Sequence, residues 1–464
     1  AVEDYVLTVD ANGECSWEAA SSGVSSDSDS NTLGGTGAGN NLASGANRNT
    51  LFGREAGEAI STGDDNVAFG AFALKSNTTQ GNNTALGYSA QYYNTGSNCI
   101  AIGSTSLFRG TGNSNVGIGY YTGYALTSGN EDILIGNYTG QALTEGQANV
   151  AIGHDALSTS IDGNNNVAIG KNAISEGDAG SGNSAVGYQA LMFTTGTNNT
   201  AVGNSALRGA TSCSNNVAVG QGAMYESWSS GGNTAVGSDA LRGGSSPSGE
   251  NNVAIGRYAG QDVTTGYGNV FAGKSAGENV NTAYNNVAIG HESLYVGTSA
   301  RENVAIGWQA LKNCYEHVNT AVGERALYNC NAAGVVGLGS QAGYSTTNSY
   351  GSTFIGFRAG YDVTGGYNTC VGRDSGNSGT NDLTSGTNNT LIGYNAAASS
   401  ATVSNEVTLG DTNITKFRVP GVSLEASISA VTQGGVFYEN NTTVVANYTI
   451  TNGRNAMAAG PITI

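Results

Sequence analysis

A five-residue phrase, Asn-Val-Ala-Ile-Gly, returns along this chain at a short and nearly constant interval, for example at residues 149–153, 166–170 and 252–256. The closing glycine of each related phrase serves as an anchor. The anchors lie at positions 53, 70, 87, 103, 119, 136, 153, 170, 187, 203, 220, 237, 256, 273, 290, 307, 323, 339, 356, 372, 393 and 410. Most intervals are 16 or 17 residues, with single intervals of 19 and 21. Self-similarity at a fixed short period indicates a repeat protein.

Each repeat is too short to hold a strand, a crossover helix and two loops, because such a crossover alone needs about a dozen residues. Alternation of β-branched and small residues before the anchor predicts a short strand. We therefore expect an all-β parallel solenoid with one 16–17-residue coil per repeat, each coil holding two strands of four or five residues joined by tight glycine turns. Asparagine recurs four residues before most anchors, so we expect these amides to stack and hydrogen-bond along the axis.

Alanine occupies the second position before many anchors and alternates with the aliphatic residues on either side of it. If the aliphatic residues fill the coil, the alanines lie on an outer face, where their small size lets another chain approach closely. We therefore predict a homotrimeric rod with a buried alanine face between chains, since symmetric homo-oligomers are the commonest assemblies. The alanines concerned are Ala68, Ala85, Ala151, Ala168, Ala185 and Ala201.

The two ends of the chain depart from the repeat, which suggests three segments. Residues 1–30 predict a small β segment, with strands around a turn at 11–13, and a Ser/Asp-rich connector. Residues 31–412 predict the solenoid of about 22 repeats, beginning with a degenerate coil at 31–48. Residues 413–464 alternate as β structure and end within a strand-like stretch, so we expect the C-terminal segment to be incomplete.

Composition narrows the function classes. The formal net charge is −17, with only 17 Lys and Arg residues, which argues against a nucleic-acid-binding surface. No apolar run approaches the length of about 20 residues that a membrane-spanning helix needs, and no signal peptide is visible. The six cysteines form no CxxC pair, so we expect no metal site.

One cysteine pair follows the repeat. Cys314 and Cys330 each lie seven residues after an anchor, 16 residues apart, so they should stack in neighbouring coils. A disulfide and two stacked free thiols both remain open.

The sequence resembles known families in three places. The repeats are similar to the left-handed parallel β-roll of trimeric autotransporter adhesin heads, whose coils carry a Val-Ala-Ile-Gly phrase followed by a small residue. The segment from Val6 to Trp17 resembles one common in tailed-phage fibre proteins. Residues 435–461 resemble the C-terminal region of marine and cyanobacterial phage tail fibres. The coiled-coil stalk and membrane-anchor barrel of the adhesins are not recognisable here.

Candidate sites are few. His154 and His291 follow their anchors directly and His317 lies in a loop, so we expect three solvated surface imidazoles. No catalytic, cofactor-binding or metal-binding constellation is recognisable, and we expect no enzyme activity and no cofactor. A polysaccharide-degrading enzyme would need paired carboxylates about 5–10 Å apart, which could still form between chains. A crowd of tyrosines suits stacking on sugar rings, so a glycan contact is a candidate beside simple cover of the surface: Tyr88, Tyr92, Tyr93, Tyr120, Tyr121, Tyr124 and Tyr138.

These observations and the resemblance lead to one functional expectation and one alternative. We expect a structural virion appendage, a tail or head fibre that forms a rigid rod involved in host-cell attachment. Its expected place is the surface of the extracellular particle, and its expected partners are identical chains, other virion proteins and a host surface glycan or receptor. The alternative is a bacterial cell-surface adhesin or extracellular filament subunit with the same β-roll.

Overall fold

The computed structural model describes residues 5–9, 15–19, 24–226, 231–243, 248–379 and 381–416, and within them every regular element is a strand. The chain divides into two compact units, Ala1–Asn413 and Ile414–Ile464. The predicted C-terminal segment therefore lies almost wholly outside the described residues. Everything below concerns the first unit.

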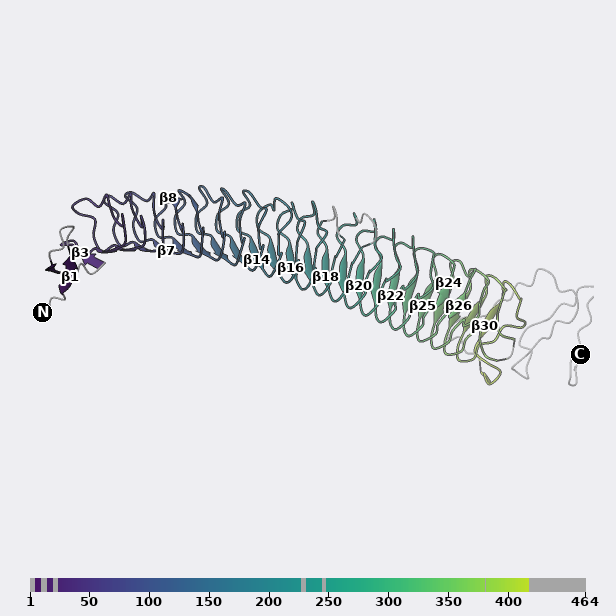
Figure 1. Cartoon of the computed structure of the whole chain (residues 1–464). Coiled ribbons are helices and arrows are strands. Elements are labelled where there is room, and N and C mark those ends of the chain that lie inside the picture. The colour runs from purple at the N-terminus through teal and green to yellow at the C-terminus, as the bar shows by residue number, and fades with distance from the viewer. Residues whose placement is uncertain are drawn as a thin grey trace, which may run out of the picture. The chain divides into compact units, whose positions relative to one another are not determined.

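The repeat phrase forms one three-residue strand per coil, and each strand pairs in parallel with the strand of the next coil, as Figure 1 shows. For example, β14 (Val167–Ile169) pairs residue for residue with β13 (Val150–Ile152). This confirms a parallel solenoid with one repeat per turn. The remaining ladder strands are β4 (Thr32–Gly34), β5 (Thr50–Phe52), β6 (Val67–Phe69), β7 (Thr84–Leu86), β9 (Ile100–Ile102), β11 (Val116–Ile118), β12 (Ile133–Ile135), β15 (Ser184–Val186), β16 (Thr200–Val202), β17 (Val217–Val219), β18 (Thr234–Val236), β19 (Val253–Ile255), β20 (Val270–Ala272), β21 (Val287–Ile289), β22 (Val304–Ile306), β23 (Thr320–Val322), β25 (Val336–Leu338), β27 (Thr353–Ile355), β28 (Thr369–Val371), β29 (Thr390–Ile392) and β30 (Val407–Leu409).

The N-terminal segment forms strands where the sequence predicts them. Strands β1 (Tyr5–Val9) and β2 (Cys15–Ala19) pair antiparallel, and the predicted turn between them lies outside the described residues. Strand β3 (Val24–Ser26) runs antiparallel to β4, and β4 stacks on β5 as the expected degenerate first coil.

The second strand that we expected in each coil is mostly absent from the described coils. Only two short pairs form opposite the ladder, β8 (Tyr93–Asn94) with β10 (Arg109–Gly110) and β24 (Asn329–Cys330) with β26 (Ser345–Thr346). Elsewhere this side consists of turns and isolated bridges. Its backbone groups still bond to the next coil, as Leu157 N–H does to the Ala173 carbonyl at 3.0 Å. Coil-to-coil bonding is therefore retained without regular strand geometry.

The asparagine ladder is confirmed. The backbone N–H of Asn66 donates to Oδ1 of Asn49 at 3.0 Å, and the side-chain Nδ2 of Asn66 donates to the same oxygen at 3.0 Å. Nδ2 of Asn49 donates to the Gly63 carbonyl at 2.9 Å. Each amide thus joins two coils and closes the loop that precedes the next strand. A buried backbone group without a partner would cost about 1–3 kcal/mol, which explains why a side chain with both donor and acceptor recurs here.

The anchor position needs glycine because neighbouring coils touch there. Gly170 adopts a φ of +131°, and a Cβ atom added to it would lie 2.5 Å from the Gly187 carbonyl oxygen. That separation is too short for any side chain, and the conformation is one that only glycine adopts readily. The anchors therefore stack on one another along the axis, as predicted.

The alanine face was predicted on the wrong side. Ala68, Ala85, Ala151, Ala168, Ala185 and Ala201 are all fully buried inside the coils of a single chain. The flanking residues point outward instead, and Val67 and Phe69 expose 40% and 56% of their surface. The coil is so narrow that only a small residue fits at the centre of the strand. These alanines cannot form an interface between chains.

The core keeps a nearly constant volume by exchanging residues between two positions. Nine coils pair alanine at the strand centre with leucine four residues after the anchor, as in Ala151 with Leu157. In four coils a leucine or phenylalanine replaces the alanine and glycine replaces the leucine, as in Phe271 with Gly277, whereas Leu391 is paired with Ala397. A Cβ on Gly277 would lie 2.3 Å from the Phe271 ring. Close packing of this kind tolerates a change in one residue only when the other compensates.

Candidate interaction surfaces

Among the described residues, the most extensive apolar surface is formed by the side chains that point out of the coil from the ladder strands. We call this surface the outward face. It consists of the residues three positions and one position before each anchor. The first column holds Val, Thr, Ile or Ser, and the second holds Ile, Val, Leu, Phe or a single Ala, so neither contains a charge in any of the 22 coils. The members with the largest exposed fractions are Val67, Phe69, Leu86, Ile100, Ile133, Ile152, Val186, Val202, Val217, Val236, Ile255, Ile289, Ile306, Val322, Ile355, Ile392, Val407 and Leu409.

The size of this face sets it apart from an ordinary protein surface. Ile289 exposes 41% of its side chain and Ile392 exposes 42%, and most of the others are similar. Together they offer on the order of 1,000 Å² of apolar area, whereas the largest patch on a typical monomer covers about 300–600 Å². Such a face is suited to a packed interface.

The tyrosines singled out from the sequence form one continuous cluster. Tyr92 and Phe108 have ring centroids 5.4 Å apart, Phe108 and Tyr124 5.2 Å, and Tyr121 and Tyr124 5.0 Å, all nearly parallel. Tyr93 packs edge-on against Phe108 at 5.4 Å. Tyr88 joins the cluster by contact with Phe72, and Tyr120 and Tyr138 join it by contact with Tyr121. All seven predicted tyrosines therefore lie in one aromatic cluster.

Cations cover parts of this aromatic cluster. The Arg54 guanidinium lies 4.4 Å from the Phe72 ring centre, and the Lys75 ammonium lies 5.1 Å from it. Lys75 also pairs with Glu55 at 2.5 Å, and this hydrogen bond raises the lysine pKa. Arg109 lies 5.7 Å from the Tyr124 ring. Cation–π contacts at exposed sites contribute about 0.5–1 kcal/mol each.

The packing limits what the aromatic cluster can do. Rings stacked on one another along the axis cover each other's faces, and a sugar ring needs an open aromatic face. Tyr88, Tyr93 and Tyr120 are the exposed members, at 57%, 55% and 43%. The glycan contact therefore stays a prediction, restricted to these three side chains. Sequence reasoning missed Phe72 and Phe108, although their distance from the anchor places them in columns shared with the tyrosines.

Among the described residues, the three histidines named from the sequence lie apart from one another. His154 and His291 are exposed as predicted and contact the carboxylates that follow them, Nδ1 of His154 at 2.6 Å from Asp155. His317 is half-buried, with Nδ1 buried and without a partner, so the expectation of a solvated imidazole was wrong there. Nowhere in the described ranges do three or more His, Cys, Asp or Glu side chains gather as a metal site.

Asp132 is an exception within the asparagine ladder. Its Oδ1 accepts hydrogen bonds from the backbone N–H and Nδ2 of Asn149 at 2.9 and 3.0 Å, as an asparagine oxygen would. Its Oδ2 takes the place of the amide nitrogen, and this buried oxygen has no partner. Burial raises the pKa of Asp132 to about 6. A protonated carboxyl would restore the missing donor.

The cysteines of the solenoid are buried thiols. Cys99, Cys213, Cys314, Cys330 and Cys370 are all free. The stacking of Cys314 on Cys330 is supported by a hydrogen bond between their side chains, which together with burial raises the pKa of Cys314. Burial raises the pKa of Cys213 to about 11 and that of Cys370 to about 12.

Comparison with known proteins adds no identification at this point. Neither a family model nor a curated protein sequence matches this chain. Within the described ranges, a helix of the length and apolarity that a membrane span requires is not found.

Proposed function

We propose that this chain is a structural, non-enzymatic rod of a virion appendage, a tail or head fibre, in which identical chains pack along the outward face and which takes part in host-cell attachment. The observation that carries the proposal is the outward face, with two uncharged columns maintained over 22 repeats. A surface of this kind on a single chain favours aggregation unless a partner covers it.

The stacked coils suit a load-bearing spacer. Each coil is tied to the next by a parallel strand pair, by ladder amides such as Asn286 with Asn269 at 2.9 Å, and by a turn on the opposite side. Lids and regulatory elements that move usually have low local stability, whereas the described coils repeat one arrangement. Rigidity over many repeats is what a spacer requires.

Identical chains are the partner that fits the outward face best. Because both columns repeat with the period of the coil, a second copy aligned along the same axis presents the same apolar spacing over its whole length. Two such faces, each of on the order of 1,000 Å², would bury about 2,000 Å² together, at the upper end of the roughly 1,200–2,000 Å² of a standard interface. The resemblance to adhesin heads implies three copies around a common axis. The placement in a virion rests on the resemblance of the two ends to phage fibres.

Immunogold electron microscopy tests the placement. Antibodies against the full chain would be applied to virus particles purified from the source culture and, separately, to uninfected cells. We expect gold along fibres that project from the particles and none on the cells. Gold on the surface of uninfected cells would contradict the virion proposal and favour the adhesin alternative.

A further inference from the structure

One column of side chains next to the ladder has a single gap. The second residue after each anchor from Gly53 to Gly393 adopts a left-handed conformation, for example Asn172 with φ +58°, Ser205 with φ +56° and Asp239 with φ +54°. Gly222 has φ +63° in the same column and is its only glycine among the 22 repeats. Since other residue types adopt this conformation throughout the column, the backbone does not require glycine at position 222.

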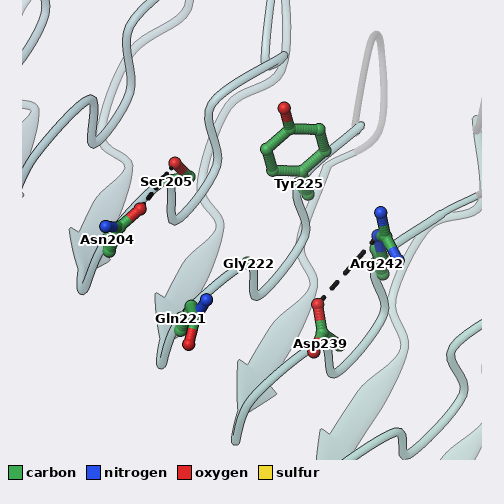
Figure 2. Close-up of a pocket in the computed structure, with 7 residues that line it drawn as sticks. All are labelled: Asn204, Ser205, Gln221, Gly222, Tyr225, Asp239 and Arg242. Atoms are coloured by element: carbon green, nitrogen blue, oxygen red, sulfur yellow. Dashed lines mark hydrogen bonds and ion pairs between the residues drawn. The ribbon is translucent and has the colours of Figure 1, made fainter.

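The missing side chain opens a groove between neighbouring coils, shown in Figure 2. Ser205 and Asp239 occupy the coils on either side, two strand spacings or about 10 Å apart. The groove has a volume of about 230 Å³, and Gly222 lies at its centre. A Cβ at position 222 would lie 2.7 Å from Oδ1 of Asp239. A side chain there would therefore displace this carboxylate and occupy part of the groove.

The aromatic wall of the groove is held in place from both sides. The Tyr225 hydroxyl accepts a hydrogen bond from Nη1 of Arg208 at 3.1 Å. The guanidinium groups of Arg208 and Arg242 lie 5.6 and 5.8 Å from the centre of the Tyr225 ring. Fixed polar and aromatic groups of this kind reduce the entropy lost when a ligand binds.

The polar wall offers donors and acceptors side by side. Oδ2 of Asp239 accepts from the Ser238 hydroxyl at 2.9 Å, and Oδ1 lies 4.0 Å from Nε of Arg242. Asn204 and Gln221 are exposed and add two carboxamides, each with a donor and an acceptor. The opposite charges of Asp239 and Arg242 balance within the groove.

We propose that this groove binds one neutral, hydroxylated six-membered sugar ring. Each sugar hydroxyl can donate one hydrogen bond and accept others. Adjacent hydroxyls therefore match the Asp239 carboxylate, which accepts, beside the Arg242 guanidinium, which donates, and the two carboxamides, which do both. The guanidinium groups of Arg208 and Arg242 lie over the Tyr225 ring, so the apolar part of the sugar would meet the edge of this ring instead of its face. An anion would meet the Asp239 carboxylate, and a divalent cation would find only one carboxylate beside Arg242. The inference does not depend on chain self-association, so the two can fail separately.

Saturation-transfer NMR on the full chain tests this proposal. The probes are the methyl pyranosides of glucose, galactose, mannose and N-acetylglucosamine at millimolar concentration. We expect transfer to at least one of them with wild-type protein. The Gly222→Asn variant should lose about tenfold or more of this signal, because asparagine fits the backbone but occupies part of the groove. The Asp239→Asn variant should bind more weakly through loss of the charged acceptor.

The matched control is Gln341→Asn, which changes the same column at a distant coil with φ +57°. It should leave the transfer unchanged, and all three variants should melt as wild type does. Equal transfer in wild type and the Gly222→Asn variant would overturn the proposal. Absence of transfer to every pyranoside from wild-type protein would overturn it as well.

Discussion

At the scale of single residues, the asparagine ladder explains both the regularity of the chain and the pH sensitivity expected at Asp132. Each ladder asparagine accepts a hydrogen bond from a backbone N–H of the next coil and donates one to a loop carbonyl. Oδ1 of Asn149 accepts from the Asn166 N–H at 2.9 Å, and its Nδ2 donates to the Gly163 carbonyl at 2.9 Å. Asp132 supplies the acceptor but not the donor unless it is protonated. The ladder therefore favours the neutral acid at this position.

Replacing Asp132 by asparagine should make the protein more stable at high pH. The folded-state pKa of about 6 lies above the unfolded value of about 3.9. The folded protein binds more protons between these values, so the free energy of unfolding falls as pH rises from about 4 to about 6 and is then constant for this group. Asp132→Asn should add about 3 kcal/mol at pH 8 and little at pH 4.

Thermal melting of wild type and the Asp132→Asn variant at the two pH values measures this difference. The exposed loop carboxylate Asp162 provides a control, because Asp162→Asn should change neither melting curve appreciably. An equal gain for Asp132→Asn at both pH values would contradict the protonation argument.

The buried cysteines give a second prediction at this scale. Because burial raises the pKa of Cys213 to about 11 and that of Cys370 to about 12, little thiolate exists at pH 8. Iodoacetamide should not modify either residue in the native protein and should modify both after unfolding in guanidinium. Peptide mass spectrometry measures the fraction of each cysteine that is modified. Rapid modification in the native protein would contradict this prediction and show that the coils around Cys213 and Cys370 open.

The sequence could predict the ladder but not which face of the strand is buried. When one repeat makes one coil, an asparagine at a fixed distance from the anchor lies next to the asparagine of the neighbouring coil. The hydrogen-bonded ladder therefore follows from the period. Alternation in Val167-Ala168-Ile169 shows that neighbours face opposite sides, but it does not show which side is inside. Residue size favoured aliphatic burial, whereas the narrow coil buries Ala168 and leaves Val167 and Ile169 half-buried at the surface.

At the scale of the coil, packing depends on pairs of positions. Phe271 is fully buried, and both Gly260 and Gly277 leave room for its ring. Phe271→Ala should cost about 3–5 kcal/mol through the cavity it leaves. Gly277→Leu should also destabilise, by about 1–3 kcal/mol or more, because the added side chain meets the ring.

The double variant with Phe271→Ala and Gly277→Leu should recover most of this loss. It recreates the alanine and leucine pair of coils such as that of Ala288 and Leu294, and leucine fits the backbone there, since Leu294 adopts φ +45° and Gly277 φ +59°. Guanidinium unfolding followed by circular dichroism measures all four proteins. Strictly additive destabilisation would contradict the volume exchange.

The same packing shows why the second strand of each coil was not predictable in detail. Opposite the ladder, the residues seven after the anchor include Ile60, Asn77, Leu126 and Cys314, a mixture of apolar, polar and thiol side chains. Without a fixed alternation the backbone there forms turns, and among the described residues regular pairs occur only at β8–β10 and β24–β26. The aromatic cluster was predictable in its tyrosines, but the groove at Gly222 depends on a missing side chain, which no motif marks.

At the scale of the whole molecule, the outward face should determine how many chains associate. Ile152 and Ile169 occupy neighbouring coils in the same column. Replacing both by lysine places two charges where the proposed interface excludes water, so we expect the assembly to dissociate partly or completely. Asp162→Lys, on an exposed loop, should leave the assembly intact. Size-exclusion chromatography with light scattering distinguishes these results, and an unchanged mass in the isoleucine variant would contradict the assigned interface.

Sedimentation equilibrium of the unmodified full chain tests the central claim most directly, because it measures mass without assuming a shape. If the outward face packs against identical chains, the mass should be three times that of one chain and should stay constant over the micromolar concentration range. A mass of one chain throughout that range would contradict the account, because the outward face would then be exposed to water in the stable protein.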